Sequence, residues 1–388
     1  MEYSQFNVYI NDSPCNGYTL IYNTLSKQVL CINSAKMCSP SEQILEKMKR
    51  MGIVVENSDA EVEAVEANYV QNLFNTDELR IILVLTRKCN CRCIYCYEDA
   101  QSASFPDVTD THPIIRFIEK MMEERNLPKL RIIFYGGEPL LRKRIITDIS
   151  LHFHQKLMSK YRFSMITNGT LLEREDVCCW NALGLESIKV TMDGDALSHN
   201  SRRPYADLSG TYHDILNRLT AVKNETHIVL NIVIDSEISG IDKLIEDITA
   251  KGIKPEYALS FREPCMCSPE EKAKIVIQYV RLLKEKGVFQ STKIAFDHGT
   301  ICMGKDENYF VLDGQGLVYQ CNGNFSSVIG TLNGEINKTH KKELSTACMK
   351  CTFLPICHGG CLYEHRCEKD YFSIVVPELV KIYTKIVQ

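Results

Sequence analysis

The sequence has 388 residues with a formal net charge of -4, and 45% of its residues are hydrophobic while 24% are charged. This length and composition indicate a globular protein of two or three domains. Because the sequence has no basic block, we expect no nucleic-acid partner. No apolar run approaches the roughly 20 residues of a membrane span, so we expect no membrane partner either.

The N-terminal residues Met1-Glu-Tyr-Ser are polar and show no secretory signal, so we expect a cytoplasmic protein. The chain has 18 cysteines. Disulfides are rare in a reducing compartment, so this number favours metal clusters.

Residues 1–78 are expected to form a separate small domain. Short strands are predicted at 5–10, 17–22 and 27–33. A helix is predicted to follow, with Ser39 as its N-cap, Glu42 closing a capping box, and Ile44, Leu45 and Met48 on its apolar face.

From Leu79 onward, strands and helices alternate. Such alternation predicts right-handed crossovers and a parallel sheet, and therefore an α/β fold. The six expected strands are 81–85, 130–135, 163–167, 187–192, 227–234 and 257–261. Apolar helical faces are predicted from Ile114, Phe117, Ile118 and Met121, and from Ile145, Ile149 and Phe153.

Three cysteines, Cys89, Cys93 and Cys96, follow the first strand, with three and then two residues between them. Three thiolates on one loop can hold three irons of a four-iron cluster and leave the fourth iron open to a substrate. The alternatives are a zinc site or a disulfide knot, but zinc sites favour pairs that a longer loop separates. We interpret Cys91 as a bystander, since its use as a ligand would destroy the spacing.

This spacing, with the aromatic Tyr95 before the last cysteine, resembles the radical S-adenosylmethionine (SAM) superfamily. The resemblance implies a six-fold partial barrel with its site at the ends of the strands. It implies that the Gly-Gly-Glu segment binds the methionine amino group and that an arginine meets the carboxylate. Asn200 stands where the family usually has an aspartate. The residues expected to hold SAM are Gly136, Gly137, Glu138, Thr167, Asn168, Thr191, Asp193, Arg203 and Tyr95.

A capped helix is predicted from Ser268 to about Lys286, and a hairpin from 310–312 and 317–321. The hairpin belongs to a second cysteine array that resembles the SPASM domain of radical SAM enzymes, with four residues between Gly316 and Cys321. The resemblance implies two auxiliary clusters, and a zinc ribbon would explain only Cys348 and Cys351. The implied ligands are Cys348, Cys351, Cys357 and Cys367 for one cluster, and Cys302, Cys321 and Cys361 for the other.

The second of these sets leaves one iron without a protein ligand, unless Cys265 or Cys267 reaches it. The expected domains are a leader-peptide-recognition domain of winged-helix type at 1–78, the partial barrel at 79–287 and the SPASM domain at 288–388. The winged-helix likeness has no sharp motif, and a purely structural extension is the alternative.

These resemblances imply a peptide maturase with SAM and three four-iron clusters. Its expected reaction joins a Cys sulfur to a carbon of a ribosomally made precursor by a thioether, through a 5′-deoxyadenosyl radical. The expected partners are a precursor with a leader and a reductant such as flavodoxin or ferredoxin. One alternative is a sulfatase-maturing enzyme, in which an aspartate replaces Asn322. The other is an iron–sulfur electron carrier or sensor without enzymatic activity.

Overall fold

The structure is a computed structural model of the chain. It describes residues 1–10, 17–74, 77–96, 106–234, 239–261, 267–289, 302–338, 344–361, 363 and 367–384. The chain forms two compact units, which are described separately. Unit 1 comprises Met1–Asn75, Met266–Asp306 and His340–Gln388, and unit 2 comprises Thr76–Cys265 and Glu307–Thr339.

Unit 2 is built on a parallel sheet, as the sequence predicts. Six strands lie in chain order from β6 to β11, each paired in parallel with the next. Their bounds are β6 Glu78–Thr86, β7 Lys129–Gly136, β8 Tyr161–Thr167, β9 Leu185–Thr191, β10 His227–Ile234 and β11 Glu256–Phe261. All six match the expected strands to within a few residues.

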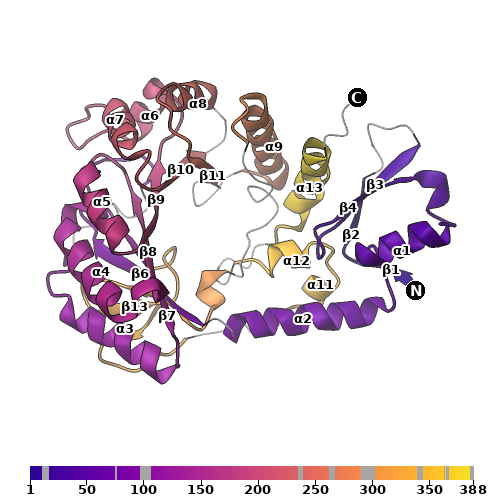
Figure 1. The fold of residues 1–388 in the computed structure, drawn as a ribbon, viewed down its shortest axis with the longest axis horizontal. Coiled ribbons are helices and arrows are strands. Elements are labelled where there is room, and N and C mark those ends of the chain that lie inside the picture. Colours follow the sequence, from indigo (N-terminus) through magenta and orange to yellow (C-terminus); the bar gives the residue numbers. More distant parts are fainter. Residues whose placement is uncertain are drawn as a thin grey trace. The chain divides into compact units, whose positions relative to one another are not determined.

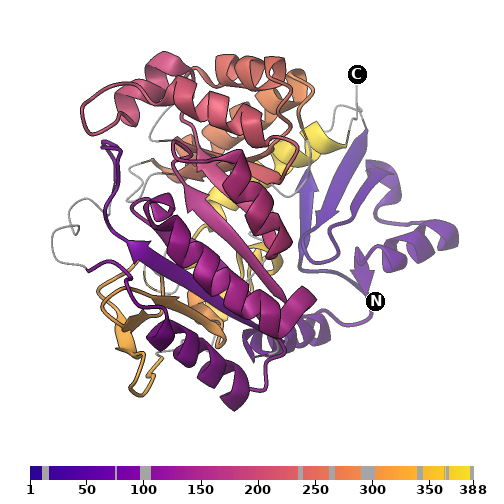
Figure 2. The ribbon, with the colours of Figure 1, turned by 60° about the vertical axis from the view of Figure 1, so that its left-hand side comes forward.

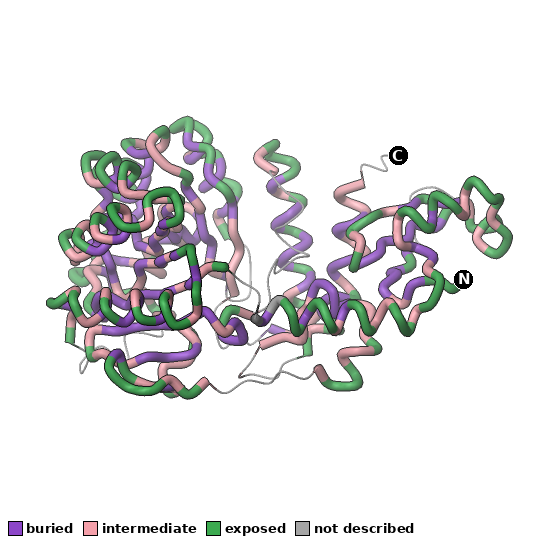
Figure 3. The backbone as a smooth tube through the Cα atoms, turned by 60° about the horizontal axis from the view of Figure 1, so that its bottom comes forward, coloured by how far each residue is buried: buried purple, intermediate pink, exposed green. Residues whose placement is uncertain are grey.

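Helices follow the strands of unit 2 and cover one side of the sheet (Figures 1 and 2). The α-helices are α3 His112–Glu124, α4 Lys143–Leu157, α5 Arg174–Ala182, α6 Ala196–Arg202, α7 Tyr212–Val222 and α8 Ile241–Ala250, with short 3-10 turns η3 Pro139–Arg142 and η4 Met158–Lys160. Buried residues concentrate on the strands and on the inner faces of these helices (Figure 3).

The predicted hairpin extends the same sheet beyond β6. Strand β12 (Tyr309–Leu312) pairs in parallel with β6, and it is followed by the antiparallel strands β13 (Leu317–Tyr319) and β14 (Val328–Thr331). Tyr309, Val311 and Tyr319 pack with Ile82 and Val84 in one buried cluster. The sequence predicts the hairpin but gives no sign that it would join the parallel sheet.

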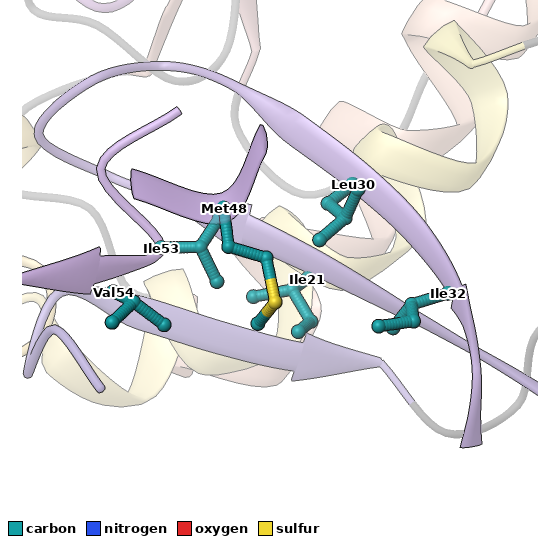
Figure 4. Packing of buried hydrophobic residues seen from close by; sticks show 6 residues of the cluster. All are labelled: Ile21, Leu30, Ile32, Met48, Ile53 and Val54. Atoms are coloured by element: carbon teal, nitrogen blue, oxygen red, sulfur yellow. The ribbon is translucent and has the colours of Figure 1, made fainter. Parts of the chain in front are cut away.

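The N-terminal part of unit 1 contains a three-stranded antiparallel sheet in the order β2-β3-β4. Its elements are β1 Glu2–Tyr3, β2 Asn7–Ile10, β3 Tyr18–Asn23, β4 Val29–Asn33, η1 Ser34–Lys36, α1 Glu42–Arg50 and β5 Val54–Val55. Met48 of α1 points into a cluster with Ile21, Leu30, Ile32, Ile53 and Val54 (Figure 4). Ile44 and Leu45 pack against this cluster, which confirms the predicted apolar face.

The remaining elements of unit 1 come from both ends of the chain. They are α2 Ser58–Phe74, α9 Pro269–Glu285, η5 Met303–Lys305, α11 Thr346–Met349, α12 Leu354–Cys357 and α13 Lys369–Tyr383. Phe6 and Val65 pack with Leu354 in a buried cluster. The Gln5 side chain donates a hydrogen bond to the Met349 carbonyl over 2.9 Å, and the Thr24 hydroxyl donates one to the Thr352 carbonyl. The N-terminal segment therefore shares its core with the C-terminal one.

Of two predicted helix N-caps, one agrees with the structure and the other does not. The predicted capping box of α9 is present, with the Ser268 hydroxyl accepting from the Glu271 N–H. The prediction for α1 was wrong, because its N-cap is Ser41 rather than Ser39 and its side chain makes no capping hydrogen bond. The backbone at Ser41 is extended, so the helix starts two residues later than the Ser-Pro-Ser-Glu pattern suggests.

The predicted face of α4 is also displaced, because Ile146 joins Ile149 and Phe153 in the core while Ile145 is half-buried. None of the helices in the described part of the chain is long and apolar enough to cross a membrane. The compact units divide the chain differently from the three expected domains, which stay a prediction.

Candidate active site

The first cysteine loop begins where β6 ends, and Asp107 fixes its start. The carboxylate of Asp107 accepts hydrogen bonds from the Thr86 hydroxyl over 2.5 Å and from the Lys88 ammonium over 3.0 Å. Arg142 also donates to it. The Asp107 side chain is only 8% exposed, whereas that of Lys88 is 73% exposed, so the buried carboxylate with its three donors is what holds the start of the loop.

The backbone of the cysteine loop is hydrogen-bonded to residues 202–206, which begin at the last residue of α6. The N–H groups of Arg92 and Ile94 donate to the carbonyls of Pro204 and Arg202 over 2.8 and 3.0 Å. The Ala206 N–H donates to the Asn90 carbonyl over 3.0 Å. The chain after the fourth parallel strand therefore helps to set the shape of the loop.

The Gly-Gly-Glu segment packs directly on the cysteine loop. Gly137 and Glu138 donate their N–H groups to the carbonyls of Thr86 and Lys88 over 2.8 and 2.9 Å. A Cβ atom on Gly137 would lie 2.5 Å from the carbonyl oxygens of Arg87 and Lys88, closer than real Cβ contacts. The close approach that requires glycine here is thus an approach to the protein's own cluster loop.

Glu138 is fully buried and connects the ends of β7 and β8. Its carboxylate accepts hydrogen bonds from the Thr167 hydroxyl (2.7 Å), the Leu140 N–H (2.9 Å) and the Asn168 N–H (2.8 Å). Burial raises the pKa of Glu138 to about 7, against the lowering effect of these three donors. Both carboxylate oxygens thus accept hydrogen bonds from the protein. Glu138 therefore holds the ends of β7 and β8 together, a role that the sequence analysis did not assign.

Asn168 joins the turn after β8 to the cysteine loop. Its amide nitrogen donates to the Asn90 side-chain oxygen over 2.8 Å and lies 3.7 Å from the Cys89 sulfur. Asn90 in turn donates to the Thr170 hydroxyl over 2.8 Å. The predicted site residues at the ends of the first three parallel strands therefore form one connected network.

The thiols of the loop differ in character. A hydrogen bond from the Cys91 thiol is the largest effect on Cys89, and together with donors from Cys91 N–H and Asn168 it lowers the pKa of Cys89 to about 6. Burial raises the pKa of Cys93 to about 11. Cys91 is buried and forms a β-bridge with Tyr205, so it stabilises the conformation of the loop.

Tyr95, Asp193 and Arg203 form a second network at the same edge of the sheet. The Tyr95 hydroxyl hydrogen-bonds to Asp193, and Arg203 donates to that hydroxyl over 2.6 Å. Asp193 also accepts from the Val233 N–H over 3.0 Å and lies 3.4 Å from Arg202 Nε. Among the residues that the structure describes, the buried Nε atom of Arg203 has no partner, which leaves this guanidinium able to bind an additional anion.

His199 holds Arg203 in place through a chain of hydrogen bonds. Its Nδ1 atom accepts from the Asp193 N–H over 3.1 Å, which leaves the proton on Nε2 for the Thr211 hydroxyl at 2.9 Å. Thr211 then donates to the Arg203 carbonyl over 2.7 Å. Burial lowers the pKa of His199 to about 3, so the ring is neutral near pH 7.

Asn200, at the position where the sequence departs from the family pattern, caps α7. Its side-chain oxygen accepts from the Tyr212 N–H over 3.0 Å. An uncharged amide supplies this acceptor as a carboxylate would. Sequence reasoning missed the structural roles of Asp107 and Thr211, because neither stands in a motif. Thr191 is buried at the end of β9, and no hydrogen bond of its side chain adds to the two networks.

The second array places several cysteines around short helices of unit 1. Cys348 lies in α11 and Cys357 ends α12, while Cys302 caps η5. Cys351 donates its N–H to the Cys348 carbonyl over 2.9 Å. Burial raises the pKa of Cys357 to about 11, and the nearby backbone N–H groups of Gly359 and Gly360 act in the opposite direction. The Gly360 N–H donates to the Cys357 carbonyl over 3.1 Å. N–H groups close to a sulfur favour its thiolate form.

The proposed ligand sets differ in how far the structure describes them. Cys348, Cys351, Cys357 and Cys367 all belong to unit 1, as do Cys302 and Cys361. Cys321 belongs to unit 2. Both ligand sets stay predictions. Cys267 is buried before α9, while Cys265 lies outside the described residues. Among the described residues, no three His, Cys, Asp or Glu side chains surround one point that would suit a single metal ion.

Known proteins match the part of the chain that forms this site. Residues 83–239 match the model of the radical SAM superfamily. The GTP 3',8-cyclase of Thermodesulfovibrio yellowstonii is 31% identical over 196 residues, which cover 49% of this chain and 56% of the relative. The radical SAM cyclopropyl synthase TigE of Paramaledivibacter caminithermalis is 25% identical over 217 residues, covering 51% and 45%. The chain thus spans about half the length of these curated relatives.

Solved structures share the fold over more of the chain. The structure of anSMEcpe with bound AdoMet has a TM-score of 0.61 at 16% identity and covers 79% of this chain and 98% of its own. SuiB of Streptococcus suis, bound to the precursor peptide SuiA, has a TM-score of 0.51 at 13% identity and covers 93% and 95%. At these identities the likeness concerns the fold alone. The segment 83–239, with its cysteine loop and the strand ends that surround it, is a radical SAM domain, and the chain that carries it is an enzyme.

Proposed function

We propose that the chain is a peptide maturase that closes a Cys-to-carbon thioether within a ribosomally made precursor. The observation that carries the proposal is the second cysteine array, whose cysteines other than Cys321 share one compact unit with the N-terminal sheet. A radical SAM domain explains the first loop alone. The further thiols suit auxiliary clusters of SPASM type, and a small sheet suits binding of an extended leader at its edge.

The described residues fit SAM and a first cluster. Cys89 has a lowered pKa, which favours the thiolate that binds iron, and Cys93 and Cys96 follow it on a fixed loop. The buried, unpartnered Nε of Arg203 suits the carboxylate of the methionine moiety. In this proposal the backbone of Gly136–Glu138, with Thr167, Asn168, Thr191, Asp193 and Tyr95, lines the rest of the SAM site.

Within this site the protein's own side chains position SAM and shield it from water. When bound, SAM and the reduced cluster supply a 5′-deoxyadenosyl radical that removes a hydrogen atom from the peptide. Arg203, held by His199 and Thr211, orients the methionine end. Glu138 and Asn168 keep the strand ends and the cluster loop together. Because these groups are buried, their hydrogen bonds are shielded from water and the geometry is preorganised.

The proposal assigns three four-iron clusters to the chain. The first uses Cys89, Cys93 and Cys96, and one auxiliary cluster uses Cys348, Cys351, Cys357 and Cys367. The other auxiliary cluster uses Cys302, Cys321 and Cys361, and leaves one iron for the thiolate of a substrate cysteine. The external reductant would be a flavodoxin or ferredoxin.

The proposed domains are a winged-helix-type leader-binding domain at 1–78, a partial barrel at 79–287 and a SPASM domain at 288–388. SuiB provides a comparison for the N-terminal part, because its structure was solved with its precursor peptide and its likeness covers 93% of this chain. By analogy, a precursor leader would add a strand to the β2-β3-β4 sheet.

A test uses the full chain, reconstituted anaerobically with iron and sulfide. With SAM, a reductant and Cys-containing precursors, thioether closure should remove two hydrogens per cross-link and retain the sulfur. Formylglycine formation would instead remove the sulfur and would establish the sulfatase-maturing alternative. Failure to form 5′-deoxyadenosine under all conditions would contradict a radical SAM reaction.

The leader is tested separately with the same full chain. A labelled leader should bind at roughly micromolar affinity, near -8 kcal/mol. A scrambled leader of the same composition is the control and should bind at least about tenfold more weakly, a difference of about 1.4 kcal/mol. Equal affinity for both, or undiminished modification of a leaderless peptide, would contradict the assignment of residues 1–78.

A further inference from the structure

Lys305 is a buried lysine inside the second cysteine array. It ends η5, three residues after Cys302, and is only 6% exposed. Lysine is almost never fully buried without a partner, because an ammonium ion loses its hydration. In the described residues no carboxylate forms an ion pair with it. The groups that compensate its charge must therefore be of another kind.

Two carbonyl groups accept hydrogen bonds from the ammonium group. The Nζ atom donates to the carbonyls of Gly359 (3.2 Å) and His358 (3.5 Å), which lie in the turn between Cys357 and Cys361. Burial lowers the pKa of Lys305, while Cys302, Cys357, Cys361 and Cys348 act electrostatically in the opposite direction. These four cysteines come from both proposed auxiliary ligand sets.

The carbonyls that Lys305 holds belong to an unusual turn. His358, Gly359 and Gly360 have consecutive positive φ values of 51°, 76° and 70°. Within this left-handed run the Gly360 N–H donates to the Cys357 carbonyl over 3.1 Å, so the turn closes back on the cysteine. The carbonyls of His358 and Gly359, in the same turn, accept from the Lys305 ammonium group.

The aromatic ring of Tyr69, which belongs to α2, lies next to the Lys305 ammonium group. Its centroid lies 5.8 Å from the Lys305 Nζ atom, within the range of a cation–π interaction. Burial, followed by the nearby Cys302 and Cys348 thiols, raises the pKa of Tyr69 to about 12. A neutral phenol here adds no competing negative charge to the site.

We propose that Lys305 is a positioning residue of the auxiliary clusters, which orders the turn between Cys357 and Cys361 and stabilises the reduced state of a cluster by its fixed charge. The inference rests on the proposed auxiliary clusters. Reduction adds one electron, and thus one negative charge, to a cluster. A buried ammonium group favours that change strongly, because the surrounding dielectric is low.

The experiment is a redox titration with dithionite, followed by electron paramagnetic resonance on the reconstituted full chain. Lys305→Gln keeps a hydrogen-bond donor for the two carbonyls but removes the charge. It should retain the iron and shift one auxiliary signal to a lower potential by at least a tenfold change in the reduction equilibrium, which is 59 mV for one electron. Lys305→Arg should keep the wild-type potential.

Lys338→Met is the matched control. Lys338 also donates to two carbonyls, those of Glu307 and Tyr309, and lies 4.3 Å from the centroid of the Phe310 ring. It resembles Lys305 in these contacts, which are to two carbonyls and a ring outside the cysteine array. The potentials of this variant should equal those of the wild type.

Several outcomes would overturn the inference. A wild-type potential in Lys305→Gln, or an equal shift in Lys338→Met, would show that the charge of Lys305 has no specific effect. If Lys305→Gln loses iron, Lys305→Arg must restore both iron and potential, and its failure to do so also overturns the inference. A wild-type chain that binds only one cluster would instead refute the proposed auxiliary clusters.

Discussion

Gly137 donates its backbone N–H to the carbonyl of Thr86 over 2.8 Å, and so joins the segment after β7 to the start of the cysteine loop. A side chain at Gly137 would collide with the carbonyls of Arg87 and Lys88. Gly137→Ala should therefore displace the loop, destabilise the protein by about 1–3 kcal/mol and prevent binding of the first cluster. Iron analysis and urea denaturation check both effects.

Gly287→Ala is the control for this substitution. Gly287 has a positive φ of 68°, but an added Cβ atom would meet nothing within 4 Å. It should cost about 1 kcal/mol of backbone strain and leave the iron content unchanged. If it lost as much iron as Gly137→Ala, the collision with the loop would not be the cause.

Cys91→Ala is expected to retain the first cluster and SAM cleavage, because Cys91 is buried and bridges to Tyr205. Loss of its packing and of its hydrogen bond to Cys89 should cost about 1 kcal/mol of stability. Cys89→Ala should instead remove about a third of the iron, as one of three independent four-iron clusters, and all SAM cleavage. Loss of cleavage in Cys91→Ala with the other clusters intact would contradict the ligand assignment.

Arg203→Lys should weaken SAM binding by at least about tenfold, or about 1.4 kcal/mol. Lysine cannot reproduce the planar guanidinium that contacts Tyr95 while its Nε atom remains available. Equilibrium dialysis with the reconstituted protein measures the affinity. Arg202→Lys is the control, since Arg202 already binds the Asp193 carboxylate and the Val233 carbonyl. Equal losses of SAM affinity in both variants would argue against a specific role of Arg203.

His199 predicts a pH dependence of stability in the protein without iron. Its folded-state pKa is about 3 and its ordinary value is 6.5, so the unfolded chain binds a proton that the folded chain rejects. Stability is thus complete above pH 6.5 and falls as the pH drops toward 3. Between pH 8 and 5.5 the loss from this group should be about 1.4 kcal/mol.

His199→Asn should reduce that pH dependence, because an amide can accept from the Asp193 N–H without titrating near neutral pH. Guanidinium denaturation of both proteins at pH 8 and 5.5 provides the comparison. An unchanged difference between the two pH values would show that His199 is not the responsible group.

The sequence predicts the six strands β6 to β11 well, since each is an apolar run whose length and spacing are typical of parallel sheets. The helical face of Ile114, Phe117, Ile118 and Met121 is confirmed because all four are buried. Helix α2 is different, since it has no clear apolar stripe in its sequence. It is stabilised by tertiary contacts such as that of Val65 with Phe6 and Leu354.

Within the site, the sequence indicates which segments meet but not how they are connected. The spacing of the motifs places Gly137, Asn168 and Asp193 just after three successive parallel strands, and thus at one edge of the sheet. It does not reveal that the Glu138 carboxylate binds Thr167 and Asn168, or that the Lys305 ammonium binds the Gly359 carbonyl, because both depend on contacts across the fold. Polar groups outside motifs, such as Asp107, become visible only when their buried partners are known.

The pairing of β12 with β6 has a consequence for how the protein is made. The two strands meet along Tyr309–Arg80 and Leu312–Leu83, so they are separated by more than two hundred residues of chain. At about 5–20 residues per second, a ribosome needs roughly 10–45 s to span that interval. Throughout this time the apolar edge of β6 at Ile82 and Val84 lacks its partner strand, and the nascent sheet is open to wrong pairing. Synthesis of this chain should accordingly benefit from chaperones that cover a waiting strand edge until residue 312 has left the exit tunnel.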